Sequence, residues 1–439
     1  MGYARPDGRA GTANYWLIVP LVFCENQNVA TLQRALSEQL GFAAGKASEL
    51  DLSAMILAYR EGASAEALRE VPVRYRVTER ARSPLFPNVD GIKYLLHEGG
   101  CGNSKSDVEA LLRLLAGYIT HPNVAGATVI GLGCQFAQAG MLRAAVQRSA
   151  PGYNRPLYIL EQQQYGTEEQ LLTEAARVTF IGLTEANRIT RSPQPLHNLS
   201  LGLECGGSDG FSGISANPTL GRVSDLLVAA GGRALLAEFP ELNGVEQELV
   251  NRCRTAESAQ KFVSLMRAYA ASAVRAGSTF ADNPSPGNIR EGLITDAMKS
   301  AGAARKGGSS PIVDVLDYGE VATRAGLHLL NTPGNDVEST TALAGAGANL
   351  IVFTTGLGTP TGNPVAPVVK IASNSALAER MPDIIDFDCG AIIRGKTTID
   401  ALAEQLLNYL LEVASGRVTP AAVRRGQDDF IPWRRGVSL

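Results

Sequence analysis

The sequence has no apolar run long enough to span a bilayer, which needs about 20 residues. The longest apolar run near the start of the chain, YWLIVPLVFC, covers residues 15–24 and contains Pro20. No basic segment with a cleavage site precedes this run, so it lacks the pattern of a secretory signal. These absences predict a cytoplasmic protein without a membrane partner.

Basic clusters and closely spaced cysteine pairs are also missing. The formal net charge is -3 and no Lys/Arg run stands out, so nucleic acid is not an expected partner. The six cysteines are scattered and include no CxxC pair, which argues against a disulfide framework. In a reducing compartment such cysteines are buried small side chains, catalytic thiols or metal ligands.

Short apolar segments alternate with helical patterns along most of the chain. The predicted buried strands are residues 15–23, 126–133, 155–160, 178–183, 233–239, 327–332 and 348–356. The predicted helices are residues 28–40, 105–119, 139–150, 167–178, 220–232, 246–277 and 397–416. This alternation predicts an α/β fold, in which mostly parallel sheets are flanked by helices.

A polar, proline-containing stretch at residues 185–200 interrupts this pattern. We place a domain boundary there, because 439 residues exceed what one hydrophobic core usually covers. The prediction is an N-terminal α/β domain over residues 1–190 and a C-terminal α/β catalytic domain over residues 191–439.

Three cysteines share one local setting. Cys101 in HEGGCGNSKSD, Cys134 in GLGCQFAQ and Cys205 in LECGGSDG each lie in a glycine-rich loop beside a strand or helix. Ligands of parallel sheets bind in the loops at the carboxyl ends of the strands, and thiolates bind iron or zinc. The pattern predicts a metal site where these thiols converge; packing of small buried cysteines beside glycine is the alternative.

Longer motifs resemble the altronate/galactarate dehydratase family over nearly the whole chain. In family order they are GYARPDGRAGTAN, GGCG, GLGC, CGGSDGFSGISANPTLG, DNPSPGN, NTPGNDVES, IVFTTGLGTPTGNPVAP and KIASNSALAERMPD. The resemblance implies a lyase that eliminates water from sugar acids to give 2-keto-3-deoxy acids. It also implies a divalent metal, usually iron; we expect mononuclear Fe²⁺ or an iron–sulfur cluster, with Mn²⁺ as an alternative.

Such an elimination needs a base for the proton α to the carboxylate and an acid for the departing hydroxyl. In the motif loops we assign catalytic roles to His97, Ser208 and Asp209, with the three cysteines as metal ligands. His97 suits a base or ligand because its charge changes near neutral pH. A structural histidine and a local Asx turn at Asp209 are the alternatives.

Further polar side chains in the motifs are expected to bind substrate. Arg5 and Arg9 flank a Pro-Asp-Gly turn, and guanidinium groups bind carboxylates through paired hydrogen bonds. Helix capping is the alternative for Asn217. The full set of expected substrate-binding residues is Arg5, Asp7, Arg9, Asn14, Asn217, Asn283, Asn288, Thr332, Asn335, Asp336, Thr354 and Thr355.

Four positions depart from the family pattern by replacing a charged side chain with a neutral one. They are Ala13 in GTAN for GTRN, Gln135 in GLGCQ for GLGCE, Ile289 in PGNI for PGNK and Leu357 in TTGLG for TTGRG. These changes predict a substrate other than the usual aldarates and hexonates, such as a smaller or less anionic hydroxy acid. Two alternatives stay open: expulsion of another group, such as sulfite from sulfolactate, and a non-catalytic protein that binds a sugar acid.

Family members commonly carry a small β-rich domain ahead of the GYxRPDGR motif, and this chain starts at that motif. In sulfolactate-type relatives this domain is a separate subunit. The resemblance therefore predicts a small β-rich partner subunit, or a site that functions without it. We also expect a homo-oligomer that binds a small hydroxy-acid substrate.

Overall fold

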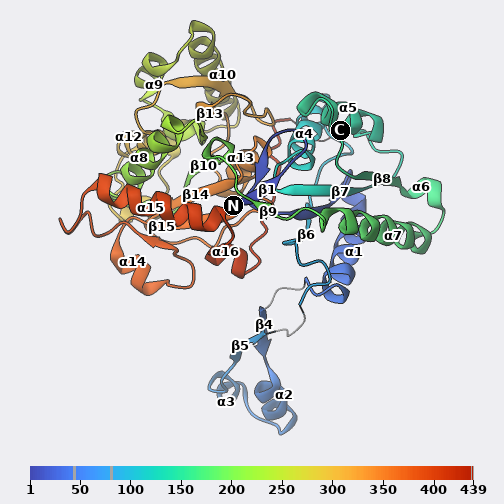
Figure 1. The fold of residues 1–439 in the computed structure, drawn as a ribbon. Coiled ribbons are helices and arrows are strands. Elements are labelled where there is room, and N and C mark those ends of the chain that lie inside the picture. The colour runs from blue at the N-terminus through green and yellow to red at the C-terminus, as the bar shows by residue number, and fades with distance from the viewer. Residues whose placement is uncertain (43–45, 80–82, 437, 439) are drawn as a thin grey trace.

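The computed structural model describes residues 1–42, 46–79, 83–436 and 438 (Figure 1). Two parallel sheets flanked by helices make up most of the molecule, which confirms the predicted α/β fold. In the described part of the chain, no helix has both the length and the apolar character needed to cross a membrane.

The first sheet belongs to the N-terminal part of the chain. Its four parallel strands lie in the order β6 (Gly91–Tyr94), β3 (Tyr15–Pro20), β7 (Val124–Gly131) and β8 (Leu157–Glu161). The helices that cover it are α1 (Asn26–Gln39), α4 (Lys105–Ile119), α5 (Ala139–Ser149) and α7 (Glu168–Ala186). Successive side chains of β3 enter two different cores, because neighbouring residues of a strand point to opposite faces.

The predicted strand at residues 178–183 is wrong, because this apolar run is part of α7. The helix begins with a capping box, in which Thr167 and Gln170 each accept a hydrogen bond from the other's backbone N–H. Gly182 lies so close to Trp16 that a Cβ atom would collide with the indole ring. The apolar run reflects this close packing, and a short apolar run does not distinguish a helix from a strand.

The second sheet has seven parallel strands, with its first strand in the middle. Their order is β12 (Ile312–Leu316), β13 (Gly326–Leu330), β11 (Arg233–Leu236), β10 (Ser200–Cys205), β14 (Leu350–Thr355), β15 (Val368–Ala372) and β16 (Phe387–Asp388). Strand β10 pairs with β11 on one side and with β14 on the other. The chain thus builds outward from β10 in both directions, which makes this a switch point of the kind where open α/β sheets bind ligands.

Helices cover both faces of the second sheet. One face packs against α8 (Ala216–Ala229), α10 (Ala256–Arg275) and α15 (Ile399–Ala414). The other face packs against α13 (Asp336–Gly345), which crosses α4 of the first sheet. The two helices approach so closely that a Cβ atom on Gly117 would collide with the Gly345 backbone. One hydrophobic core therefore continues from the first sheet to the second.

The predicted helix at residues 246–277 is two helices, α9 (Glu246–Arg252) and α10, because Thr255 caps a new helix by accepting from the Ser258 N–H. The remaining short helices are α6 (Gln162–Tyr165), α11 (Pro286–Arg290), α12 (Asp296–Ala304), α14 (Ser375–Arg380) and α16 (Ala421–Arg424).

The amino ends of both sheets are tied together by buried hydrogen bonds. Thr12 Oγ1 donates to the Asn349 carbonyl at 2.7 Å, and Asn123 Nδ2 donates to the carbonyls of Asn349 and Val365 at 3.1 and 2.8 Å. A small antiparallel sheet of β2 (Ala10–Gly11), β1 (Gly2–Ala4) and β9 (Arg191–Ser192) lies beside them. The opposite, carboxyl ends of the strands are left to loops and helix starts.

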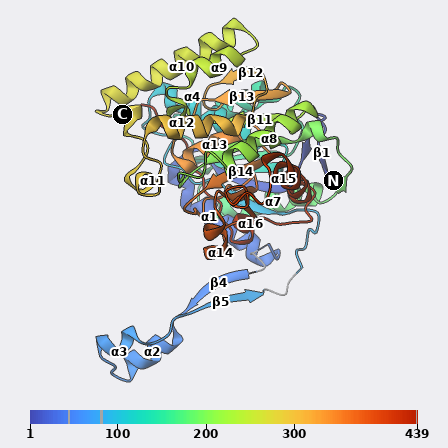
Figure 2. The same cartoon turned by 90° about the vertical axis from the view of Figure 1, so that its left-hand side faces the viewer.

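An arm that the sequence did not predict projects from the part of the molecule that contains the first sheet, in both views (Figures 1 and 2). It consists of the antiparallel strands β4 (Lys46–Asp51) and β5 (Arg74–Glu79) and the helices α2 (Ser53–Arg60) and α3 (Ala65–Arg69).

Candidate functional site

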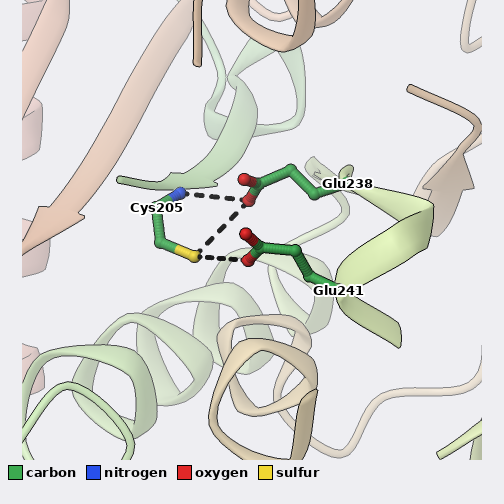
Figure 3. A group of neighbouring side chains, drawn as sticks. All are labelled: Cys205, Glu238 and Glu241. Carbon is green, nitrogen blue, oxygen red and sulfur yellow. Dashed lines mark hydrogen bonds between the residues drawn. The ribbon is translucent and has the colours of Figure 1, made fainter. Parts of the chain in front are cut away.

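A group of buried side chains lies at the carboxyl edge of the seven-stranded sheet. Cys205 ends β10, and Glu238 and Glu241 follow the neighbouring strand β11, around the short helix η3 (Phe239–Leu242). Figure 3 shows both carboxylates directed at the thiol, with Sγ 3.5 Å from Glu238 Oε2 and 3.2 Å from Glu241 Oε2. Among the described residues, this is the one group of three cysteine, histidine or acidic side chains whose ligand atoms lie within 4.8 Å of each other.

Glu238 has an unusual backbone conformation. Its φ and ψ angles are 68° and 59°, and no other non-glycine residue in the described ranges has a positive φ. The Cys205 N–H donates to Glu238 Oε2 at 3.1 Å, and the Glu238 N–H donates to Thr332 Oγ1 at 2.8 Å. Left-handed backbone is costly for a residue with a Cβ atom and is concentrated at functional sites. The strain at Glu238 therefore marks this group as a functional candidate.

Two lysines from a more distant segment complete the cluster. Lys306 lies in η5 (Arg305–Gly307), directly after α12, and its Nζ is 2.8 Å from Cys205 Sγ and 2.5 Å from Glu238 Oε2. Lys299 Nζ, from α12 itself, is 2.6 Å from Glu241 Oε1. Lys306 is fully buried and the Lys299 side chain is 11 % exposed, so Lys299 forms the outer rim of the cluster.

The pKa values in this cluster respond to burial and to neighbouring charges. Burial, together with the Glu241 charge, raises the pKa of Glu238 to about 7. Burial and the two carboxylates also raise the pKa of the Cys205 thiol well above its ordinary value. Burial alone would lower the pKa of Lys306, but the surrounding thiol and carboxylates raise it well above the ordinary value. The site thus favours bound positive charge.

Two more acids border the cluster. Glu204 is fully buried on β10, and one of its carboxylate oxygens accepts from Ser339 Oγ at 2.7 Å. Asp336 lies against Gly206, where a Cβ atom would collide with its carboxylate, and burial raises the pKa of Asp336 to about 6. Glu204 Oε1 and Glu238 Oε1 are buried with no hydrogen-bond partner among the described residues.

This arrangement can hold a divalent cation. Four carboxylates and a thiol face two ammonium groups, and buried negative charge without compensation is strongly unfavourable. Glu238 Oε1 provides a buried acceptor without a partner among the described residues, on the carboxylate whose Oε2 lies beside the thiol. One sulfur and two carboxylates are donors that suit first-row transition metals. Cys205, Glu238 and Glu241 therefore fit a metal ion.

The three cysteines predicted as metal ligands do not form one group in the structure. Cys101 and Cys134 lie in the loops that follow β6 and β7 of the other sheet, which touch where the Ala137 N–H donates to the Gly100 carbonyl at 3.0 Å. Cys134 is exposed and Cys101 is partly exposed, whereas Cys205 is buried. The three cysteines do not converge because Cys205 ends a strand of the second sheet, where its neighbours come from the segments after β11 and from α12 and η5.

His97 lies apart from this cluster, on a cavity of about 480 Å³ between the carboxyl-end loops of the two sheets. Glu98 of the first domain, Glu338 of the second and Trp433 near the C-terminus line the same cavity. The His97 ring bonds the Pro20 carbonyl through Nε2 at 2.8 Å and accepts from the Gly99 N–H through Nδ1 at 3.1 Å. Burial lowers the pKa of His97 to about 4, so the structure holds this ring neutral, with both nitrogens occupied.

Asp209 and Ser208 organise the loop after β10. Asp209 Oδ1 accepts from the hydroxyls of Ser212 and Ser373, both at 2.8 Å, and its Oδ2 accepts from Asn374 Nδ2 at 3.0 Å. The Ser208 carbonyl accepts from Asn288 Nδ2 at 2.9 Å. Both residues are buried. The Asp209 carboxylate thus joins the loops after β10 and β15, which agrees with the alternative of a local structural role.

The N-terminal motif lies at the amino end of the first sheet, because it precedes β3. Arg5 donates to the carbonyls of Pro122 and Ala13 at 2.6 and 3.3 Å, and Arg9 pairs with Asp7 at 2.6 Å. Asn14 Nδ2 donates to the carbonyls of residues 88 and 186. Arg5, Asp7, Arg9 and Asn14 therefore stabilise the amino ends of the strands, whereas the cluster lies at the carboxyl ends.

The predicted residues at the strand ends fall into two sets. Asn217 and Thr354 bond each other at 2.7 Å inside the protein, and Thr355 Oγ1 accepts from the Gly358 N–H at 2.9 Å. Thr332 is fully buried and accepts from the Glu238 N–H. The hydroxyl groups of this set stabilise the site from within.

The second set lies nearer the rim. Asn283 Oδ1 accepts from Lys299 Nζ at 2.6 Å, next to Glu241. Asn335 caps α13 directly before Asp336, and Asn288 accepts from the N–H of Ser285, the N-cap of α11. Besides Thr332, which bonds Glu238, the predicted substrate-binding residues that the structure places beside the cluster are thus Asn283 and Asp336.

Sequence reasoning missed Glu238, Glu241, Lys299 and Lys306. Glu238 could have been found, because it lies at the end of the predicted strand 233–239, as Cys205 does at its own strand end. Lys306 gave no such signal, since it follows a helix and lies 101 residues from Cys205 along the chain.

Comparisons with known proteins match both halves of the chain. A family model described as D-galactarate/altronate dehydratase, C-terminal, matches residues 196–438, and one described as D-galactarate dehydratase/altronate hydrolase, second domain, matches residues 2–187.

Curated relatives agree with these models. The chain is 40 % identical to altronate dehydratase of Escherichia coli and 39 % identical to that of Bacillus subtilis, in each case over 80 % of this chain and 69 % of the relative. It is 29 % identical to the (2R)-sulfolactate sulfo-lyase subunit beta of Chromohalobacter salexigens, over 82 % of this chain and 91 % of the relative. The resemblance drawn from the motifs is confirmed, and the chain belongs to the D-galactarate/altronate dehydratase family, whose named dehydratases are hydro-lyases.

Proposed function

We propose that this protein eliminates water from a sugar acid to give a 2-keto-3-deoxy acid. The observation that carries the proposal is the buried cluster of Cys205, Glu238, Glu241 and Lys306 at the carboxyl edge of the seven-stranded sheet. The names of the two altronate dehydratases support the reaction and the substrate class.

We infer that Cys205, Glu238 and Glu241 hold a divalent metal ion, with iron as the first choice and Mn²⁺ as the alternative. One thiol with two carboxylates supports a mononuclear ion over an iron–sulfur cluster, whose ligands are mainly thiolates. When bound, such an ion supplies Lewis-acid stabilisation of the negative charge that develops during elimination.

The protein's own cations have distinct roles in this proposal. Lys306, fixed between the thiol and Glu238, supplies a permanent positive charge inside a water-excluded site, where electrostatic stabilisation is strongest. Lys299 and Asn283 at the rim bind the substrate carboxylate, because they are the polar groups of the cluster nearest to solvent.

Two of the four neutral departures lie beside the loop that follows Cys205. The Leu357 N–H donates to the Gly207 carbonyl at 2.9 Å, and Ile289 is 45 % exposed on α11, next to the residue that holds the Ser208 carbonyl. Ala13 is buried at the opposite edge of the sheets. A preference for a less anionic acid would therefore arise from positions 289 and 357.

A second candidate reaction is expulsion of sulfite from a sulfolactate-like acid. It is supported by the match to 91 % of the sulfo-lyase subunit beta. Because that relative is named as a subunit, we also propose a small partner subunit, which co-purification from the native host would reveal.

The test is an anaerobic assay of the Fe²⁺- or Mn²⁺-loaded protein against altronate, galactarate and sulfolactate, followed by NMR detection of the 3-deoxy methylene group or by sulfite release. We expect a 2-keto-3-deoxy product from a sugar acid, lost in Glu241→Gln and retained in Glu98→Gln, which changes a carboxylate that lines the cavity beside His97. Sulfite release alone would favour the second candidate. Binding of the acids without any product would contradict both reactions.

A further inference from the structure

The left-handed backbone of Glu238 needs support from outside its own loop. Its N–H donates to Thr332 Oγ1 at 2.8 Å, from the end of β13. With this bond and the bond from the Cys205 N–H to Oε2, both the backbone and the carboxylate of Glu238 are fixed.

The Thr332 hydroxyl is the first member of a buried hydrogen-bonded chain. Thr332 Oγ1 lies 3.0 Å from Ser339 Oγ on α13, and Ser339 Oγ donates to Glu204 Oε2 at 2.7 Å. Thr332, Ser339 and Glu204 are all 0 % exposed. The chain therefore joins the carboxyl ends of three strands, β11, β13 and β10, through the first turn of α13.

The direction of these bonds follows from their donors and acceptors. The Glu238 N–H can only donate, so Thr332 Oγ1 accepts there and has its own proton for Ser339 or for the Pro333 carbonyl, which lies at 3.0 Å. Ser339 donates onward to Glu204. The carboxylate of Glu204 thus terminates a chain that begins at the Glu238 backbone.

The burial of Glu204 lowers the stability of the fold. Its Oε1 has no hydrogen-bond partner among the described residues, and a buried polar atom without a partner destabilises the fold. Strands β10 and β13 pack elsewhere through leucine side chains. We therefore explain the carboxylate at position 204 by its hydrogen bond to Ser339, which connects through Thr332 to the backbone of Glu238.

We propose that Thr332, Ser339 and Glu204 are positioning residues, which hold Glu238 so that its carboxylate faces the Cys205 thiol as a metal ligand. The proposal rests on the metal assignment made under the proposed function. It adds that the affinity for the ion depends on hydroxyl groups that contact neither the ion nor the substrate. Changes to such outer partners typically lower metal affinity by about 10- to 100-fold.

The test is a titration of the metal-free full-length protein with Co²⁺, read by the thiolate-to-cobalt absorption band. Thr332→Val keeps the side-chain shape and removes the hydroxyl, so we expect affinity to fall by about tenfold or more. Thr332→Ser restores the hydroxyl and is expected to restore affinity to near the wild-type value. Ser339→Ala should show a smaller loss in the same direction.

Thr128→Val is the matched control. Thr128 is a fully buried threonine in the other sheet, where its hydroxyl bonds that of Thr179 at 2.7 Å. We expect it to lower thermal stability about as much as Thr332→Val while leaving Co²⁺ affinity unchanged.

Three results would overturn the positioning proposal: wild-type affinity in Thr332→Val, no rescue in Thr332→Ser, or an equal loss in Thr128→Val. A wild-type protein that shows no thiolate–cobalt band would overturn it together with the metal assignment. A wild-type protein that binds Co²⁺ normally but converts none of the acids would contradict only the proposed reaction.

Discussion

The carboxyl edges of the two sheets carry similar sequence motifs and very different chemistry. Both have a cysteine next to glycine where a strand ends: Cys134 lies in the loop after β7, and Cys205 is the last residue of β10. Cys134 is exposed, and its loop is closed by local bonds, such as the one from the Gly133 N–H to Gln135 Oε1 at 2.6 Å. Cys205 is buried among two carboxylates and a lysine.

The difference lies in the neighbours rather than in the cysteine. Strand β10 lies in the middle of its sheet, so acids from β11 and a lysine from beyond α12 converge on its end. The loop after β6 faces a cavity, and its buried histidine is neutral. A strand-end cysteine becomes a metal-site candidate when adjacent segments bring charge to it.

The largest expected contrast is in turnover. Cys205→Ser should lower kcat by at least about 100-fold, beyond the usual effect of residues outside the ligand set. Cys134→Ser should remain within about threefold of the wild type, because Cys134 is exposed and belongs to no group of three possible metal ligands among the described residues. Equal losses in the two variants would erase the contrast between the two edges.

The next contrast is in stability. Lys306→Met removes one partner of a fully buried ion pair and should lower the free energy of unfolding by about 3–5 kcal/mol. Lys261→Met makes the same change in the half-exposed pair with Glu320 and should cost less than about 1 kcal/mol. Urea denaturation measures both. A Lys306 variant as stable as the wild type would show that the buried charges need no ammonium.

A smaller contrast concerns space at the two edges. In Gly206→Ala the new methyl group collides with the Asp336 carboxylate, so we expect a loss of about 1–3 kcal/mol and weaker metal binding. In Gly140→Ala, at the start of α5, nothing lies within 4 Å, and alanine should stabilise the helix by up to about 1 kcal/mol. Thermal melts with and without metal would separate these effects, and an unaffected Gly206→Ala variant would contradict the close packing.

The smallest contrast is a pH slope. The pKa of His97 is about 4 in the folded protein and near 6.5 in an unfolded chain. Its stabilising contribution is complete above pH 6.5 and is lost as the pH falls toward 4, because the unfolded state binds the extra proton. His97→Gln should reduce the slope of unfolding free energy between pH 6.5 and 4 by up to about one proton. An unchanged slope would mean that His97 is charged in the fold.

The sequence was sufficient for the fold class and for one member of the site. Alternating apolar runs located β3, β7, β11 and β14. The rule that ligands bind at the carboxyl ends of parallel strands located Cys205. The same rule selected Cys101 and Cys134, because local sequence does not reveal which strands become neighbours. The left-handed Glu238 and the approach of Lys306 depend on long-range packing, and no motif spacing encodes them. The strand predicted at residues 178–183 is wrong for a related reason, because this segment is a helix that packs against Trp16 of a distant strand.

The most direct test of the account is the iron content and visible absorbance of protein purified without oxygen, for wild type, Cys205→Ala and Cys134→Ala. The account predicts about one iron per chain without strong colour, lost in Cys205→Ala and retained in Cys134→Ala. A metal-free but folded and stable wild type would contradict it. So would about four irons with broad absorbance that disappear in Cys134→Ala, because that result would place a cluster on cysteines that do not form one group in the described structure.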